Sequence, residues 1–317
     1  MAPPIVIVFG ATGGVGSSTA RTAQRLGAKV FIALRNTEKP IPGLTREEEK
    51  EAGFERVQAD LTKPETIEAA VRQSGAKHAF IYLFHGDNDH MNASILALKA
   101  ADIEFVVFLS SASVHGNRSE LPPADFIPYA HAQVELALEH VFSTSGYVAI
   151  RPAFFNTNVS FWTDMFRKGE VRTAYLDAVY DWISPDDIGE ASGTVLVRGI
   201  QATEGAENRN FIYLCGPKLM TLRKAIGIFS KVLGKDIKIT ELNEEDGVAA
   251  LVESGTPEFL AKPLLRVAGQ RCGPDQEGDP TYNKKSHEQA VANLRKYAGR
   301  ATPLEEWAEA NKRLLGA

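Results

Sequence analysis

Apolar residues in the first half of the chain gather in short runs, separated by longer stretches in which they recur at helical spacing. The short runs predict strands at residues 5–9, 29–34, 54–58, 78–84, 105–109 and 147–150. The stretches between them predict helices at residues 15–26, 64–73, 88–101 and 129–143. Strands that alternate with such helices imply βαβ crossovers, and strands that are apolar throughout imply cover on both faces. The pattern therefore predicts an α/β fold with a doubly wound parallel sheet.

The alternation is looser after residue 152. Ser184 and Pro185 suit the N-cap and first position of a helix, and Thr302 begins an N-cap signature for a final amphipathic helix. Further strands are predicted at residues 210–215 and 236–241, and further helices at residues 222–233 and 256–268. We expect residues 1–155 to form the main domain and residues 156–317 mainly a smaller α+β lobe, with residues 184–216 returning to the sheet.

Composition and charge exclude several classes of protein. The chain has 317 residues, 44% hydrophobic and 24% charged, which is typical of a globular protein. Its formal net charge of −5 gives no general attraction to nucleic acid or to an anionic membrane. The two cysteines suit a reducing compartment, and neither a secretory signal nor an apolar run of about 20 residues is evident. We therefore expect a cytoplasmic protein with no nucleic-acid or membrane partner.

The strongest chemical signal is the glycine-rich segment from Gly10 to Gly16, between the first predicted strand and the first predicted helix. Gly10 permits a tight turn, Gly13 lets the backbone approach a pyrophosphate, and Gly16 lets the helix pack closely on the strand. The N–H groups that begin the helix then face the phosphates. This context predicts a Rossmann dinucleotide site, with contacts from Gly10, Thr12, Gly13, Gly14, Val15 and Gly16.

The end of the second strand indicates which dinucleotide binds. An NAD site usually has an acidic residue there, whereas this chain has Arg35, with Lys39 close behind. A guanidinium can pair with a 2′-phosphate, so the predicted cofactor is NADP, although Arg35 as a solvated surface charge is the simpler alternative. Asp60 and Leu61 follow the third strand and are expected near the adenine; a turn-forming role for Asp60 is compatible with that position.

Ligands in open α/β sheets bind at the carboxyl ends of the strands. Residues at those ends predict further cofactor contacts from Phe84, His85, Ser110, Pro152 and Phe154. Substrate contacts are expected from Phe155, Asn156 and Phe161, for which core packing is the alternative. The His and Asp residues at positions 85–90 match no common zinc spacing, so no metal site is predicted.

Several of these segments resemble the NmrA-like branch of the atypical short-chain dehydrogenase/reductase superfamily, which is related to the isoflavone-reductase-like proteins. The resemblance rests on the glycine loop, Arg35, the pair Asp60-Leu61, the run from Leu109 to Gly116, His131-x-x-x-Glu135, the run from Arg151 to Asn156, Asp187-Ile-Gly189 and the final Thr302–Trp307 segment. It covers nearly the whole chain and implies an NADP-binding domain followed by a substrate lobe.

The chain departs from the catalytic pattern of the wider superfamily, whose active members use a Tyr-x-x-x-Lys pair on one helix face. Aligned through Glu135, the Lys position is His131, the Tyr position is Ile127 and the Ser position is Ser111. The resemblance therefore implies roles for His131, in holding the nicotinamide ribose or donating a proton, and for Ser111, in touching substrate or ribose. Tyr129 is the remaining candidate donor. A surface position for His131 and a packing role for Tyr129 are the alternatives.

NmrA-like proteins divide into reductases and dinucleotide-binding regulators. Reduction of a quinone or an iminium ion needs only light acid assistance, so a missing Tyr is compatible with such substrates. The leading interpretation is an NADPH-dependent oxidoreductase acting on a small, flat, apolar acceptor such as a quinone, enone or imine. The alternatives are a regulator that binds NAD(P) without turnover and docks a protein partner, and a redox-neutral enzyme on the same fold.

Overall fold

The computed structural model describes residues 4–84, 89–206, 208–272 and 279–316. The chain divides into two compact units. The first comprises Met1–Pro152, Pro185–Leu214 and Ala292–Arg300. The second comprises Ala153–Ser184, Cys215–Val291 and Ala301–Ala317. Each unit therefore draws on segments that are far apart in the sequence.

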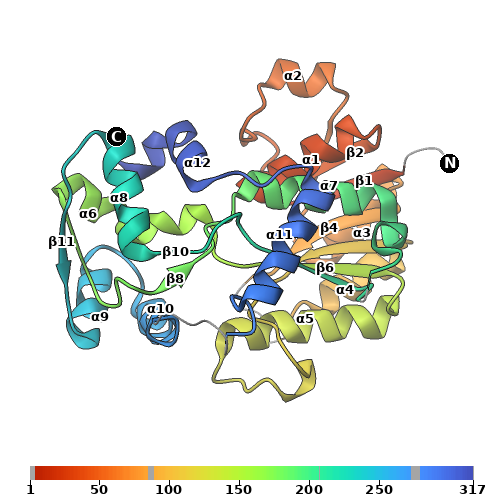
Figure 1. Ribbon diagram of the computed structural model, residues 1–317. Helices are drawn as coiled ribbons and strands as arrows, with labels where there is room; N and C mark the ends of the chain where they lie inside the picture. The colour runs from red at the N-terminus through yellow and green to blue at the C-terminus, as the bar shows by residue number, and fades with distance from the viewer. Residues whose placement is uncertain (1–3, 85–88, 207, 273–278, 317) are drawn as a thin grey trace. The chain divides into compact units, whose positions relative to one another are not determined.

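The first unit is built on a seven-stranded parallel sheet with the order β3-β2-β1-β4-β5-β6-β9 (Figure 1). Its strands are β1 (Ile5–Phe9), β2 (Lys29–Leu34), β3 (Glu55–Gln58), β4 (His78–Tyr82), β5 (Phe105–Leu109), β6 (Tyr147–Pro152) and β9 (Phe211–Leu214). The order reverses between β1 and β4, which is the switch point where α/β sheets bind ligands. The predicted doubly wound fold is confirmed.

Helices pack on both faces of this sheet. They are α1 (Gly14–Arg25), α3 (Pro64–Ser74), α4 (Asn92–Ala100), α5 (Phe126–Phe142) and α7 (Pro185–Arg198). The short helix α2 (Arg46–Glu51) lies between β2 and β3 in the chain. Helix α7 packs against α1, β4, β5 and β6, whereas α3 packs against α4, and α4 against α5. Strands β1 and β5 are apolar throughout, as expected for strands covered on both faces, whereas the edge strand β3 is mostly polar.

The second unit has its own apolar core, which includes Trp182, Phe166 and Phe229. Its strands form two pairs, β8 (Val179–Tyr180) antiparallel to β10 (Met220–Thr221) and β7 (Glu170–Thr173) parallel to β11 (Lys238–Glu241). Its helices are α6 (Thr163–Lys168), α8 (Leu222–Leu233), α9 (Glu244–Glu253), α10 (Glu258–Gln270) and α12 (Leu304–Ala310). Helix α11 (Lys284–Ala298) has residues in both units.

Some predicted boundaries were wrong. Helix α5 begins at Phe126 rather than at residue 129, because Pro128 falls in the first turn, where a missing N–H costs no hydrogen bond. Helix α12 begins at Leu304 after Pro303, with no side-chain cap, so Thr302 is not its N-cap residue. Helices α9 and α11 were not predicted. None of the helices in the described part of the chain combines the length and apolar character of a membrane span.

Helices α1 and α7 are brought together by small residues. A Cβ atom at Gly189 would lie 2.4 Å from Cβ of Ser18, and one at Gly193 would lie 2.7 Å from Cβ of Thr22. The Ser18 hydroxyl donates to the carbonyl of Asp186 over 2.8 Å. The backbones of α1 and α7 therefore lie so close together that only glycine fits at positions 189 and 193. This contact holds α1, the helix that follows the glycine loop.

Replacing Gly189 with Ala should push α1 and α7 apart and lower the free energy of unfolding by about 2 kcal/mol. The matched control is Gly227→Ala in α8, where no atom lies within 4 Å of the added methyl group. That variant should gain about 0.5–1 kcal/mol, because Ala has the higher helix propensity. Urea unfolding of both variants checks this, and an unchanged midpoint for Gly189→Ala contradicts the close contact.

Candidate functional site

The glycine loop follows β1 and leads directly into α1. Gly10 has φ +75°, and a Cβ atom there would lie 2.6 Å from the ring of Tyr82 at the end of β4. A Cβ atom on Gly16 would lie 2.4 Å from the carbonyl oxygen of Gly10. The amide of Gly13 donates to that same carbonyl over 2.9 Å. Gly10 and Gly16 are therefore required by sterics, as their spacing predicted.

The start of α1 is open to an anion. Gly13 is the N-cap residue and supplies no side-chain cap. Thr12, Gly13 and Gly14 are exposed, whereas Val15 and Gly16 are buried. A Cβ atom on Gly13 would have no neighbour closer than 3.5 Å, so this side of the loop has free space. A helix N-terminus of this kind suits a phosphate group.

The end of β2 presents Arg35 to solvent. Its carbonyl accepts a hydrogen bond from Nε2 of Gln58 over 3.3 Å, and Lys39 is likewise exposed. The Asp60 carboxylate accepts from the backbone N–H and hydroxyl of Thr62, so it does form a turn. Leu61 is buried, and its carbonyl accepts from the Ser94 hydroxyl over 2.6 Å. The adenine contacts of Asp60 and Leu61 stay predictions.

Among the other predicted cofactor residues, Phe84 is half-buried and packs against the core of the first unit. His85 lies outside the described residues. Pro152 ends β6 and is buried, and its carbonyl accepts from the N–H of Ala112 over 2.9 Å. In the described part of the chain, no group of three or more His, Cys, Asp or Glu side chains is arranged to hold a metal ion.

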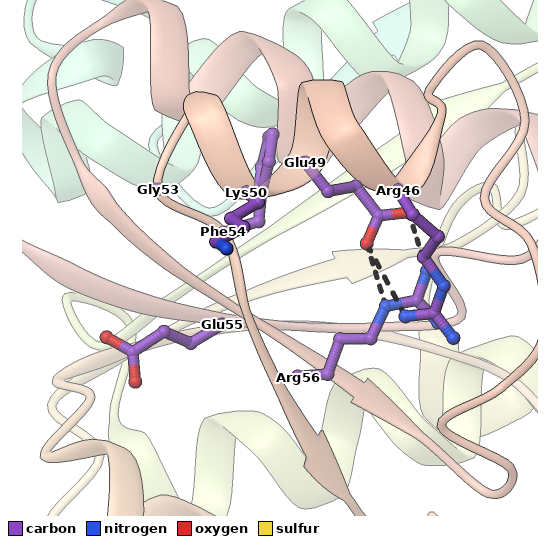
Figure 2. Close-up of a pocket in the computed structure, with 7 residues that line it drawn as sticks. All are labelled: Arg46, Glu49, Lys50, Gly53, Phe54, Glu55 and Arg56. Atoms are coloured by element: carbon purple, nitrogen blue, oxygen red, sulfur yellow. Dashed lines mark hydrogen bonds and ion pairs between the residues drawn. The ribbon is translucent and has the colours of Figure 1, made fainter.

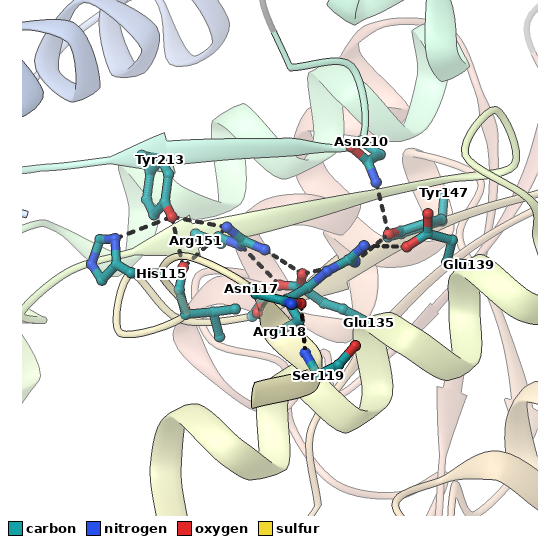
Figure 3. Close-up of polar contacts among 12 residues, drawn as sticks. His115, Asn117, Arg118, Ser119, Glu135, Glu139, Tyr147, Arg151, Asn210 and Tyr213 are labelled. Carbon is teal, nitrogen blue, oxygen red and sulfur yellow. Dashed lines mark hydrogen bonds and ion pairs between the residues drawn. The ribbon is translucent and has the colours of Figure 1, made fainter. Parts of the chain in front are cut away.

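A buried ion pair, shown in Figure 3, lies beside the segment that follows β5. Glu135 on α5 is 0% exposed and Arg151 on β6 is 3% exposed. Nε of Arg151 lies 2.9 Å from Oε1 of Glu135, and Nη2 lies 2.5 Å from Oε2. The same carboxylate accepts from the Ser110 hydroxyl over 2.6 Å. The predicted cofactor residue Ser110 therefore already has a partner within the protein.

This pair also holds the loop that follows β5. Nη1 of Arg151 donates to the carbonyl of Val114 over 3.0 Å and to the Tyr213 hydroxyl over 2.9 Å. The Tyr213 hydroxyl donates to the same carbonyl over 2.6 Å. Although burial acts to lower the pKa of Arg151, its bonds to Glu135 raise it above the usual value. Burial raises the pKa of Tyr213, so its hydroxyl stays protonated.

A second cation extends the network. Arg118 donates to the Tyr147 hydroxyl over 2.8 Å, lies 3.4 Å from Glu135 and pairs with Glu139. Asn210 also donates to the Tyr147 hydroxyl, over 2.9 Å (Figure 3). Arg118 thus ties the segment between β5 and α5 to helix α5 and to strand β6. The sequence did carry a signal for this arrangement, because Glu135 and Arg151 interrupt apolar stretches and buried charges need partners.

The predicted catalytic residues lie just after β5 and on α5. Ser111 is half-buried, and its hydroxyl is 2.8 Å from that of Ser113. Nδ1 of His131 lies 2.8 Å from the carbonyl of Ile127, and its ring centroid is 6.1 Å from that of Phe108 on β5. Tyr129 instead meets the ring of His90 edge-on at 5.5 Å. The structure thus places His131 against the strand that leads to Ser111.

The predicted substrate residues belong to the second unit. Phe154, which was predicted as a cofactor contact, lies in the same unit. It is buried against Tyr180 and Trp182, with centroid distances of 4.2 and 5.1 Å, so its ring is part of that unit's core. Phe155 and Phe161 are half-buried. Asn156 is 0% exposed, and neither polar atom of its amide has a hydrogen-bond partner among the described residues. An unpaired buried amide is costly, so Asn156 is the candidate among these for contacting a bound molecule.

Comparison with known proteins decides the family. The model of the NmrA-like family matches residues 4–300. The chain belongs to the NmrA-like family. The resemblance predicted from the sequence is therefore confirmed.

One relative of this NmrA-like protein is named for regulation and another for reduction. It is 33% identical over 320 residues to the nitrogen metabolite regulation-like protein bik4 of Gibberella fujikuroi, covering 95% of this chain and 94% of that one. It is 26% identical over 281 residues to the (4-alkanoyl-5-oxo-2,5-dihydrofuran-3-yl)methyl phosphate reductase of Streptomyces griseus, covering 88% and 92% of the two chains. The triphenylmethane reductase of Citrobacter sp. complexed with NADP(H) shares the fold, with a TM-score of 0.69 at 18% identity over 98% and 99% of the chains.

Replacing Glu135 with Gln should leave the Arg151 charge buried without compensation and lower the free energy of unfolding by about 3 kcal/mol. The matched control is Glu139→Gln on the same helix, whose side chain is 35% exposed. That variant should lose less than about 1 kcal/mol. Urea unfolding checks both, and equal losses would show that Glu135 is no more important than a surface partner.

Proposed function

We propose that this NmrA-like protein is an NADPH-dependent oxidoreductase that reduces a small, flat, largely apolar acceptor, such as a quinone, enone or imine. The observation that carries the proposal is the uncapped start of α1 at the glycine loop, where Gly13 leaves room for a diphosphate. Two comparisons support it, since one relative is named a reductase and one protein of the same fold is a reductase complexed with NADP(H).

Residues of the first unit suit the cofactor. The backbone of the Gly10–Gly16 loop would hold the diphosphate, and Arg35 would pair with the 2′-phosphate at the end of β2. When bound, the reduced nicotinamide supplies a hydride, and the acceptor gains this hydride and a proton. The proton would come from a nearby side chain or from water, because this chain lacks the Tyr-x-x-x-Lys pair.

His131 and Ser111 are the side chains proposed to orient the reactants. The hydrogen bond between Nδ1 of His131 and the Ile127 carbonyl places a proton on Nδ1 and restrains the ring. Ser111 lies two residues after the end of β5, and ligands in such sheets bind at the carboxyl ends of the strands. Tyr129 is the further candidate proton donor, and Asn156 is proposed to contact the substrate.

A second candidate function is favoured by one comparison. The relative with 33% identity is named a nitrogen metabolite regulation-like protein. A regulator of this kind would bind the dinucleotide without turning it over and dock a protein partner. Oxidation of NADPH in the presence of a panel of quinones and imines separates the two functions. Turnover supports the reductase, whereas tight NADPH binding without turnover, together with recovery of a specific protein partner, supports the regulator.

Replacing Arg35 with Ala should weaken NADPH binding about tenfold or more, because a charge-assisted pair with the 2′-phosphate is lost. NADH has no such phosphate, so its dissociation constant should change little. Titration calorimetry with both nucleotides checks the prediction. Equal losses for the two nucleotides would remove Arg35 from the proposed phosphate site.

Replacing His131 with Ala should lower kcat for the best acceptor by roughly 10²-fold if the ring assists proton transfer. The melting temperature should stay within a few degrees, because His131 is only half-buried. His140→Ala, an exposed position on the same helix, is the matched control and should keep full activity. Unchanged kinetics for His131→Ala would exclude it from the site.

A further inference from the structure

The loop that begins at Arg35 is held by the ion pair between Arg56 and Glu49, which is largely buried. We propose that Arg56 and Glu49 are positioning residues that hold the end of β2 in the geometry that selects the 2′-phosphate of NADPH. This inference rests on the proposed function, in which NADPH is the cofactor. It identifies the residues that position Arg35 to bind the 2′-phosphate. Neither Arg56 nor Glu49 was singled out from the sequence.

The pair is bidentate and largely buried. Nε and Nη2 of Arg56, on β3, lie 2.7 and 2.6 Å from the two carboxylate oxygens of Glu49, on α2 (Figure 2). Their side chains are 10% and 6% exposed. Both line the floor of an open pocket of about 350 Å³ together with Arg46 and Phe54. A fork of this kind fixes the orientation of the guanidinium as well as its position.

The remaining nitrogen of the guanidinium reaches the loop itself. Nη1 of Arg56 donates to the carbonyl of Thr37 over 2.5 Å and to that of Lys39 over 2.6 Å. Arg46 donates to the same Thr37 carbonyl over 2.9 Å. With the bond from Gln58 to the Arg35 carbonyl, the carbonyls at positions 35, 37 and 39 all receive donors from α2 or β3. Arg35 therefore projects from a backbone that is held at three alternate residues.

The loop is also folded on itself. Oδ1 of Asn36 accepts from the N–H of Glu38 over 2.9 Å, and the carbonyl of Asn36 accepts from the N–H of Lys39 over 3.3 Å. Helix α2, which supplies Glu49, begins with a capping box between Thr45 and Glu48. A guanidinium on a held backbone loses less conformational entropy when it binds a phosphate than one on a free loop. The effect should therefore appear in the binding of NADPH and not of NADH.

The decisive variant is Arg56→Lys, because it keeps the positive charge. A single ammonium group cannot form the two-point fork with Glu49 and also reach both loop carbonyls. The matched control is Arg72→Lys on α3, where Arg72 pairs with Glu68 on the surface and is 66% exposed. Dissociation constants for NADPH and NADH are measured by titration calorimetry on the full chain, with the melting temperature recorded for each variant.

We expect Arg56→Lys to weaken NADPH binding about tenfold while NADH binding changes less than about twofold. Arg72→Lys should leave both dissociation constants unchanged. A loss of affinity shared equally by the two nucleotides, or no loss, overturns the inference. An equal loss would indicate a purely structural role, which leaves the ratio of the NADPH and NADH dissociation constants unchanged. If Arg56→Lys does not fold, Glu49→Gln removes the ion pair with little change in volume. It should then weaken NADPH binding relative to NADH binding by the same factor.

Failure of the inference and failure of the proposed function are distinguishable in the same experiment. If the unaltered protein binds neither nucleotide, the proposed function fails and the inference fails with it. If the unaltered protein prefers NADPH and Arg35→Ala removes the preference, while Arg56→Lys and Glu49→Gln preserve it, only the inference fails. Amide hydrogen exchange at residues 36–39 supplies an independent readout, and faster exchange in Arg56→Lys supports the positioning role.

Discussion

The candidate site depends on a contact between two stretches of backbone at the first turn. The position of a Cβ atom on Gly16 is only 2.4 Å from the carbonyl oxygen of Gly10, so no side chain fits there. That carbonyl also accepts the N–H of Gly13, which sets the direction in which α1 leaves the strand. Helix α7 then packs on α1 through Gly189 and Gly193. The exposed N-terminus of α1 is thus held in place by small residues from two distant segments.

Buried ion pairs hold two of the loops that follow strands of the sheet. Glu135 and Arg151 hold the segment after β5, and Glu49 and Arg56 hold the segment after β2. In each case a carboxylate orients a guanidinium whose remaining N–H groups bind loop carbonyls. A hydrophobic contact could stabilise these loops equally well, but it would not fix the direction of their carbonyl groups. The arrangement therefore suits loops whose backbone geometry matters for recognition.

Much of the first unit could be predicted because each element has a local signature. The apolar runs that became β1, β2 and β5 are short and bounded by turn residues, and the glycine spacing identifies the first βα turn. Helix boundaries were predicted less accurately where a residue is compatible with two positions. Pro128, for example, could precede a helix but lies in the first turn of α5. The second unit was harder to predict, because its strands are short and its core draws on segments between residues 154 and 315. Phe154 and Asn156 are two residues apart in one motif, yet the ring of Phe154 packs in the core while the amide of Asn156 is buried without a hydrogen-bond partner among the described residues, a difference that the motif alone does not predict.

The sequence by itself determined the alternation of strands and helices, the nucleotide-type turn and the cation at the end of β2, because these features arise from residues close together in the chain. Only the tertiary structure decided which charges meet. Arg56 and Glu49 are seven residues apart, yet they pair only because β3 and α2 fold back on each other, while Arg151 meets Glu135 across a strand and a helix. Pairing of buried charges depends on desolvation and on distances of a few ångströms, which the order of residues does not specify.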